Sequence, residues 1–254
     1  MIRVLKARFQ QKYRTMQYPA GPPPELPARF RGLPELDGSK CPAGCRQCKD
    51  ACPTDAVAVT GGGRLRIDLG RCLFCGECSR ACPSGAIRFT GDHRLAVRDR
   101  SHLLTDGRSY ERASAMADEL RRLYGRSFKL RQVSAGGCNA CEADANVLTT
   151  VGWDLGRFGV QFVASPRHAD GLLITGPVTQ NMRLALEKTW AAVPDPRIVI
   201  ASGSCAISGG PYIDHPEANN GAAGIVPVDL FVPGCPPHPL TLLDGLLRLL
   251  GRLC

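Results

Sequence analysis

The chain has 254 residues, 44% of them hydrophobic, which gives room for two domains and for a sizeable buried core. The formal net charge is +9, yet no nucleic-acid-binding motif accompanies it, so we expect no nucleic-acid partner. An acidic protein partner or an anionic membrane surface explains the charge equally well. No apolar run reaches the roughly 18 residues that a membrane-spanning helix needs.

The chain contains thirteen cysteines, many of them at short spacings. No signal-peptide pattern opens the sequence, so we expect the protein to stay in a reducing cytoplasm. Cysteines clustered in such a compartment indicate metal binding rather than disulfides.

Residues 1–36 are predicted to form an amphipathic arm and a linker. Apolar side chains recur at three- and four-residue steps: Ile2, Leu5, Phe9, Tyr13 and Met16. Basic side chains fill the positions between them: Arg3, Lys6, Arg8, Lys12 and Arg14. The helix expected over residues 1–18 either lies on a membrane or partner, or packs on its own domain. Five prolines between Pro19 and Pro27 predict an extended connector.

Residues 37–98 are predicted to form the first domain, because they contain an internal repeat. Residues 45–60 align without gaps on residues 75–90, at an offset of 30. Each copy contains cysteines at matching positions and a Cys-Pro pair, Cys52-Pro53 and Cys82-Pro83. Two units too small to fold alone predict a pseudo-symmetric domain built around something other than a large core.

The spacing of the repeat cysteines is that of a bacterial two-cluster ferredoxin. The second copy runs Cys72-x2-Cys75-x2-Cys78-x3-Cys82-Pro83. Since the fourth cysteine of each run ligates the other cluster, the first cluster is expected on Cys41, Cys45, Cys48 and Cys82. The second is expected on Cys72, Cys75, Cys78 and Cys52.

The first copy departs from this spacing, because three residues separate Cys41 from Cys45, Pro42 and Gly44 among them. We expect this loop to bulge. Two four-cysteine zinc sites are the alternative interpretation. The tandem repeat and the two Cys-Pro pairs favour iron–sulfur clusters instead.

Residues 99–126 are predicted to connect the two domains through a helix from Ser109 to Tyr124, with Ser109 as N-cap and Gly125 as its stop. Residues 127–254 alternate strand-like and helical runs, which is typical of a mostly parallel sheet covered by helices. Strands are predicted at Lys129–Val133, Val160–Ala164, Gly171–Thr175, Arg197–Ala201 and Val226–Val232. Helices are predicted at Glu142–Val151, Val178–Val193 and Pro239–Leu250.

The last of these helices has apolar residues on more than one face. Leu240, Leu243 and Leu247 share a stripe, whereas Leu242 and Leu249 fall outside it. We therefore expect a partner chain to cover a second face. Asp244 and Arg248 are expected to pair at i,i+4.

Four further cysteines are spread through residues 127–254. Three of the segments that contain them follow predicted strands: Cys138 with Cys141, Cys205, and Cys235. Because ligands gather beyond the carboxyl ends of parallel strands, these loops are expected to bring four thiols together. Nearby glycines, among them Gly203 and Gly234, would permit the close backbone approach that a cluster needs.

These residues resemble known families. The stretch from Arg29-Phe30-Arg31-Gly32 through both cysteine runs resembles the 23 kDa ferredoxin-like subunit of complex I and the ferredoxin subunit of formate hydrogenlyase. Most of residues 127–250 resembles the 20 kDa subunit of complex I and the small subunit of energy-converting [NiFe] hydrogenases. The stretches that carry this second resemblance include residues 165–170, 176–179, 202–205 and 225–237. The spacing Cys138-x2-Cys141 resembles the hydrogenase branch, because complex I has two adjacent cysteines at the first position.

The resemblance implies an α+β two-cluster ferredoxin domain, followed by an α/β flavodoxin-like domain with a mostly parallel sheet. It implies three [4Fe–4S] clusters and a third cluster that faces a catalytic partner. The expected partners are a large catalytic subunit of the kind found in [NiFe] hydrogenase or complex I, membrane-arm subunits, and a further donor such as a formate dehydrogenase.

Other residues have two open interpretations each. Glu142 either assists proton movement or is a first-turn acid favoured by the helix dipole. Arg167 and His168 either tune a cluster or contact a partner, or they form an ordinary surface pair. Asp229 is expected to be a structural hydrogen-bond acceptor, and Cys254 a free thiol.

The leading hypothesis is an electron-transfer subunit of a membrane-associated [NiFe]-hydrogenase-type complex, with no substrate-converting centre of its own. The alternatives are a subunit of an NADH:quinone oxidoreductase-like complex and a stand-alone ferredoxin-like carrier. We expect a cytoplasmic protein, peripheral on the inner face of the membrane.

Overall fold

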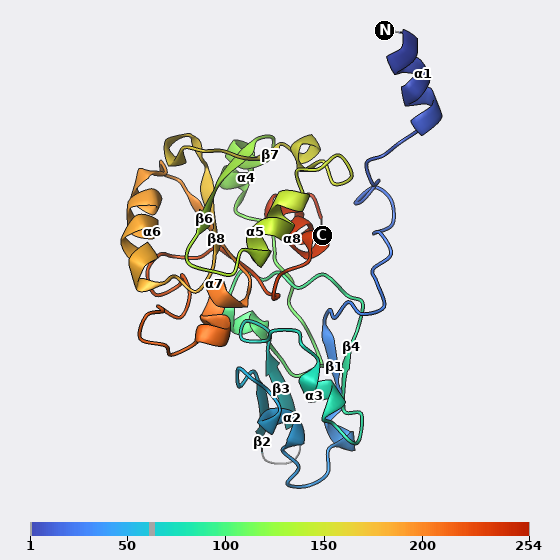
Figure 1. Ribbon diagram of the computed structural model, residues 1–254, viewed down its shortest axis with the longest axis vertical. Coiled ribbons are helices and arrows are strands. Elements are labelled where there is room, and N and C mark those ends of the chain that lie inside the picture. The colour runs from blue at the N-terminus through green and yellow to red at the C-terminus, as the bar shows by residue number, and fades with distance from the viewer. Residues whose placement is uncertain (1, 61–63, 254) are drawn as a thin grey trace.

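The computed structural model describes residues 2–60 and 64–253. At the N-terminus, α1 (Ile2–Gln11) stands away from the rest of the molecule (Figure 1). It is shorter than the helix expected over residues 1–18, and none of its residues is buried. The interpretation that this helix packs on its own domain is therefore wrong.

The repeat forms two similar halves. α2 (Gln47–Asp50) and α3 (Glu77–Arg80) begin at equivalent positions of the two copies, as do β2 (Val57–Thr60) and β4 (Ile87–Phe89). β4 pairs antiparallel with β1 (Pro34–Leu36). The second small sheet is antiparallel and consists of β2, β3 (Arg64–Asp68) and β5 (Leu104–Thr105). The sequence repeat is thus a structural repeat.

The connecting stretch differs from its prediction. Residues 109–117 are irregular, and α4 spans only Asp118–Tyr124, so the expected Ser109 N-cap is wrong. The reason is tertiary: the Ala113 N–H donates to the Ala96 carbonyl at 2.7 Å and the Met116 N–H to the Leu249 carbonyl at 2.9 Å. Because these donors find partners elsewhere in the fold, the segment satisfies its backbone without helical turns.

The second half of the chain forms a five-stranded sheet in which every pairing is parallel. Its order is β10-β9-β8-β6-β7, so the order of the strands along the chain reverses between β6 and β8. The strands are β6 (Phe128–Ser134), β7 (Val160–Phe162), β8 (Gly171–Thr175), β9 (Ile198–Ser202) and β10 (Leu230–Val232). All five predicted strands are present, although β10 is shorter than expected.

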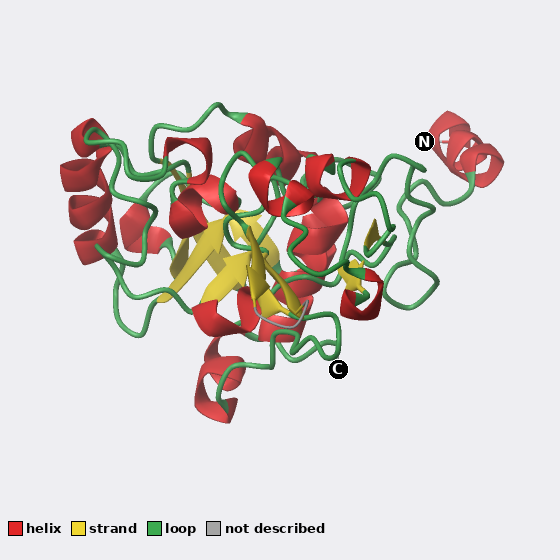
Figure 2. Ribbon diagram, turned by 90° about the horizontal axis from the view of Figure 1, so that it is seen from below, coloured by secondary structure: helices red, strands yellow, loops and turns green. Residues whose placement is uncertain are grey.

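Helices cover both faces of this sheet, with the strands in the middle of the molecule (Figure 2). The side chains of Phe128, Leu130 and Ile200 lie on one face of the sheet. This face packs against α5 (Ala140–Val147) and α8 (Pro239–Leu249). Val133 and Ile174 point to the other face, which packs against α6 (Gln180–Ala192). A parallel sheet buried on both faces has such apolar strands. These three helices are the ones that the sequence predicts, with shifted ends.

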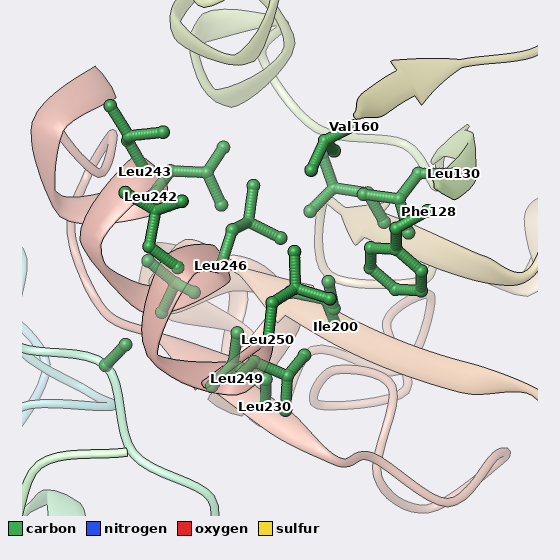
Figure 3. Packing of buried hydrophobic residues seen from close by; sticks show 14 of the residues in the cluster. Phe128, Leu130, Val160, Ile200, Leu230, Leu242, Leu243, Leu246, Leu249 and Leu250 are labelled. Atoms are coloured by element: carbon green, nitrogen blue, oxygen red, sulfur yellow. The ribbon is translucent and has the colours of Figure 1, made fainter. Parts of the chain in front are cut away.

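The position of α8 corrects the expectation of a partner on its second face. Every residue of α8 is buried within the chain, including Leu242 and Leu249. Its leucines point toward Phe128, Leu130, Val160, Ile200 and Leu230 around the sheet (Figure 3). The predicted pair is present: Arg248 Nε donates to Asp244 Oδ2 at 2.9 Å.

The two halves of the chain share one core. Ile67, Leu69 and Leu103 cluster with Ile207 of α7 (Ser204–Ser208) and with Phe231 of β10. Two backbone hydrogen bonds between Val97 and Phe231 continue the large sheet into the connecting stretch. The cysteine-rich repeat is therefore packed against one edge of the sheet. Among the helices of residues 2–60 and 64–253, none combines the length and the apolar character of a membrane span.

Candidate iron–sulfur cluster sites

The structure brings together the four thiols of the first expected set, which are those of Cys41, Cys45, Cys48 and Cys82. Burial raises the pKa of the Cys48 thiol, and the neighbouring thiols of Cys82, Cys41 and Cys45 raise it further. The extra residue between Cys41 and Cys45 is absorbed by a turn, in which the Cys45 N–H donates to the Pro42 carbonyl at 3.1 Å. Gly44 supplies the left-handed conformation that this turn needs, with φ of 73°.

The second expected set is also together, and it is more deeply buried. Burial raises the pKa of Cys72 to about 12 and that of Cys78 to about 12. Cys52 and Cys75 lie close enough to raise both pKa values further. Cys52 thus belongs with the second copy of the repeat, and Cys82 with the first, as the crossed pattern requires.

Backbone N–H groups point at three of these sulfur atoms. The Ala56 N–H donates to Cys52 Sγ at 3.2 Å, and the Ala86 N–H donates to Cys82 Sγ at 3.3 Å, so the contact repeats in both halves. The Phe74 N–H donates to Cys72 Sγ at 3.3 Å. Such bonds stabilise the thiolate, the form that binds metal.

The third expected set converges beyond the carboxyl ends of the parallel strands. A pocket there is lined by Cys138, Cys141, Cys205 and Cys235 together with short glycine-rich segments. Burial raises the pKa of Cys205 to about 12, with the thiols of Cys235 and Cys138 adding to the shift. A Cβ on Gly203, which has φ of 93°, would lie 2.6 Å from Cys141 Sγ, so only glycine fits beside that sulfur.

The second thiol set lies near each of the other two. Cys48 of the first set lies close enough to Cys78 of the second to raise its pKa. Cys75 of the second set in turn raises the pKa of Cys235 in the third. The second set is therefore the middle one.

The donor sets fit iron–sulfur clusters. In the described part of the chain, no three His, Cys, Asp or Glu side chains are placed to hold a single metal ion. The thiols gather in fours, and none of the twelve described cysteines is in a disulfide. Soft thiolates in fours, with N–H groups aimed at the sulfur, are the ligands that four-iron clusters use.

Ser204 joins the second and third thiol sets, and no sequence motif pointed to it. Its hydroxyl lies 2.6 Å from the Cys72 carbonyl oxygen and 3.1 Å from that of Gly234. It directly precedes Cys205 and is 1% exposed. Ser208, one helical turn later, donates to the Gly70 carbonyl at 2.8 Å.

Arg31 is a second residue beyond the expected set. Its Nη1 lies 3.4 Å from the Phe74 carbonyl oxygen. A Cβ on Gly76 would lie 2.6 Å from Arg31 Nε, so the guanidinium covers the loop between Cys75 and Cys78. The same side chain lines a pocket of about 480 Å³ that reaches Cys235.

Glu142 is buried beside the third thiol set. The Thr175 hydroxyl at the end of β8 donates to its Oε1 at 2.6 Å. The residue lies in the first turn of α5, as expected. It is not a surface acid, because its side chain is buried and is held by the hydrogen bond from Thr175.

The other singled-out residues lie away from the thiols. Arg167 and His168 are exposed at the amino end of β8, opposite the edge where the cysteine loops converge, so they cannot tune a cluster there. Asp229 accepts the Val199 N–H at 2.8 Å and is a structural acceptor. Cys254 lies outside the described residues.

Comparison with known proteins assigns both halves of the chain. The family model "NADH ubiquinone oxidoreductase, 20 Kd subunit" matches residues 138–249, and "4Fe-4S dicluster domain" matches residues 40–86. A probable membrane-bound hydrogenase subunit, mbhJ, of Pyrococcus furiosus is 39% identical over 59% of this chain and 90% of its own length. This chain belongs to the family of the NADH ubiquinone oxidoreductase 20 Kd subunit.

Two further relatives show the range of the family. Formate hydrogenlyase subunit 7 of Escherichia coli is 42% identical over 56% of this chain and 56% of its own length. An NADH-quinone oxidoreductase subunit of Clostridium beijerinckii is 41% identical over 46% of this chain and 70% of its own length. The two matched models together contain all twelve cysteines of the three thiol sets.

Proposed function

We propose that this chain is the electron-transfer subunit of a membrane-associated [NiFe]-hydrogenase-type complex, related to formate hydrogenlyase, and that it carries three [4Fe–4S] clusters. The observation that carries the proposal is the presence of three four-thiol sets, the second of them near each of the other two. The spacing Cys138-x2-Cys141 supports the hydrogenase branch, as do relatives named as hydrogenase and formate hydrogenlyase subunits.

Each set has a defined role in this proposal. Cys41, Cys45, Cys48 and Cys82 would hold the first cluster. Cys72, Cys75, Cys78 and Cys52 would hold the second, and Cys138, Cys141, Cys205 and Cys235 the third. A [4Fe–4S] cluster supplies reversible one-electron chemistry. The chain's own residues fix the spacing, exclude water from the buried sulfurs, and stabilise thiolates through backbone N–H groups.

The proposed architecture divides the chain as the sequence suggests. An arm and linker (1–36) precede a ferredoxin domain (37–98), a connecting segment (99–126), and a domain like the small subunits of complex I and hydrogenase (127–254). The strand order β7-β6-β8-β9-β10 supports a flavodoxin-like description of the last domain.

A large catalytic subunit is the proposed partner at the third thiol set. Cys138 and Cys235 are exposed, which supports a protein surface that covers them in the complex. Membrane-arm subunits and an external donor, such as a formate dehydrogenase, complete the proposed assembly. We place it on the cytoplasmic side of the membrane.

A quinone-reducing complex is the second candidate. The relative named as an NADH-quinone oxidoreductase subunit favours it, and the third cluster would then serve quinone at the large-subunit interface. A stand-alone carrier is the third candidate. An uncovered leucine face on α8 would have counted against it, but α8 leaves no leucine face uncovered. The exposed Cys138 and Cys235 still favour a bound partner.

Anaerobic purification with iron and sulfide analysis tests the core of the proposal. Three clusters predict about 12 irons per chain. A colourless protein loaded with zinc would refute it, and about eight irons would limit the clusters to the ferredoxin domain.

The nature of the complex is tested on the assembly isolated from its source. Nickel that co-purifies with a large subunit supports the hydrogenase type. A nickel-free complex whose clusters are oxidised by added quinone supports the quinone-reducing alternative.

A further inference from the structure

The first inference concerns α1, which has an apolar stripe with nothing on it among the described residues. Ile2, Leu5 and Phe9 follow one another at three- and four-residue steps, and their exposed fractions are 82%, 65% and 90%. A helix this short without packing is marginal in water, so its amphipathic pattern implies a surface that stabilises it.

The positive charge of the arm indicates which kind of surface this is. Arg3, Lys6 and Arg8 lie on α1, Lys12 and Arg14 follow it, and no acidic residue occurs before Glu25. A helix with Phe and Leu on one side and basic residues around it lies in the interface of a bilayer. Basic residues at such a surface are attracted to anionic lipid headgroups.

The fold holds the arm at a suitable place. The Met16 N–H donates to the Gly152 carbonyl at 2.9 Å, and the Thr15 hydroxyl donates to the Val151 carbonyl at 2.8 Å. The chain is thus fixed from Thr15 onward, and α1 projects beyond it. α1 and the repeat that contains the first thiol set lie toward opposite ends of the molecule's long axis (Figure 1).

We propose that α1 lies on the surface of an anionic lipid bilayer, with Ile2, Leu5 and Phe9 toward the acyl chains. This proposal rests on the membrane-associated complex proposed above and adds a direct lipid contact of this chain. With α1 on the bilayer, the first thiol set points away from it, into the aqueous phase where a soluble donor can reach it.

The test uses the full chain, purified anaerobically with its iron, and flotation with vesicles. The chain should float with vesicles of phosphatidylcholine and phosphatidylglycerol, but not with phosphatidylcholine alone, and high salt should release it. Phe9→Glu should abolish flotation. Leu184→Glu is the matched control, because Leu184 is an apolar side chain of α6 that is 58% exposed, and it should leave flotation unchanged.

Three results would overturn the lipid contact: no flotation with anionic vesicles, equal flotation with both vesicle types, or flotation that survives Phe9→Glu. An acidic protein surface as the true occupant gives the first of these results. Iron content measured on the same samples reports on the proposed function separately.

The second inference concerns Ser204 and rests on the same proposed function. From Cys72, a ligand of the second set, a route of chain atoms runs through its carbonyl oxygen to the Ser204 hydroxyl at 2.6 Å. From Ser204 it continues through one peptide bond to Cys205, a ligand of the third set. The same hydroxyl contacts the carbonyl of Gly234, next to Cys235, so it touches the backbone of both sets.

We also infer that Ser204 is the positioning residue that fixes the second and third clusters at the spacing needed for electron transfer between them. Clusters held by these two sets would exchange one electron at a time with no bond made or broken, and Ser204 would act only by holding the two sets at a fixed separation. The rate of electron transfer between buried centres falls steeply with their separation, so a hydroxyl that holds the backbone of both sets together controls that rate.

Ser204→Ala should slow reduction of the third cluster, followed by freeze-quench electron paramagnetic resonance after rapid mixing with a reductant, while iron content and potentials stay unchanged. Ser208→Ala is the matched control. It also removes a buried hydroxyl from the same interface, but one that bonds Gly70 rather than a cysteine, and it should leave the rate unchanged.

A wild-type rate in Ser204→Ala, or equal slowing in Ser208→Ala, would overturn this role. A measurement without any variant guards against misfolding: the paramagnetic signal of the third cluster should broaden when the second is also reduced. Absence of that magnetic interaction in the native chain would equally contradict the inference.

Discussion

At the residue scale, the cysteine sets depend on a few non-cysteine residues that control charge around them. Arg31 covers the loop between Cys75 and Cys78, and it belongs to a segment that precedes the repeat. A fixed cation stabilises the reduced, more negative state of a cluster, and so raises its reduction potential.

Replacing Arg31 with Gln should therefore lower the potential of the second cluster selectively, and Arg31→Lys should restore most of the shift. Potentiometric titration followed by electron paramagnetic resonance measures this. Arg122→Gln, an exposed charge on α4, is the control and should shift nothing. Equal shifts in all three proposed clusters would contradict a local effect.

His93 is a buried group with a different consequence. Burial lowers its pKa, although the nearby Asp244 carboxylate opposes the shift. Because the folded state then binds a proton at lower pH than the unfolded chain does, the unfolded chain gains protons first as the pH falls below about 6.5. Acidification through that range therefore favours unfolding.

The free energy of unfolding should thus decline as the pH falls below about 6.5, and His93→Phe should weaken that decline. Urea titrations between neutral and mildly acidic pH measure it. His168→Phe at the exposed end of β8 should leave the pH dependence in place. An unchanged dependence in His93→Phe would contradict this assignment.

At the element scale, α8 is the central helix of the second half. Its leucines pack on the sheet, and its Asp244–Arg248 pair is enclosed, with side chains 1% and 9% exposed. The Tyr18 hydroxyl also donates to Asp244 at 3.1 Å, which ties the N-terminal linker to the helix. Burial raises the pKa of Tyr18, so this hydroxyl keeps its proton and remains a donor.

Asp244→Ala should destabilise the protein by about 3–5 kcal/mol, because it removes the buried carboxylate that accepts hydrogen bonds from Arg248 and Tyr18. The matched control is Glu187→Ala, which breaks an i,i+4 pair with Arg183 that is half exposed. That change should cost about 0.3–0.5 kcal/mol. Denaturant titration measures both, and equal losses would show that burial of the pair does not matter.

At the scale of the whole molecule, the cysteine-rich repeat and the large sheet behave as one packed unit. Gly70, two residues before Cys72, touches α7 so closely that a Cβ there would lie 2.8 Å from Ile207 Cγ2 and 2.7 Å from Arg100 Cζ. This contact packs the loop that precedes Cys72 against α7.

Gly70→Ala should push the two halves apart and destabilise the protein by about 1–3 kcal/mol. It should also weaken the magnetic interaction between the second and third clusters. Gly91→Ala is the control, since a Cβ there meets nothing within 4 Å. A Gly70→Ala protein as stable as this control would show that the interface tolerates separation.

The local features of this protein could be predicted from its amino-acid sequence. Cysteine spacing within one loop and the constant offset between the two repeats are properties of the chain, so they predicted the two halves of the repeat and the crossed thiol sets. The apolar period likewise predicted the five parallel strands. Loops after parallel strands meet at one edge, which is why the third set could be expected before it was seen.

The long-range features emerge only in the folded molecule. Residues 109–117 form no helix because their N–H groups bond to distant carbonyls. The helix α8 is covered on all sides because the sheet, the N-terminal linker around Tyr18 and the connecting stretch meet on it. Ser204 and Arg31 acquire their importance from contacts 132 and 43 residues away along the chain. Such contacts follow from how the finished elements pack, which no pattern of neighbouring residues encodes.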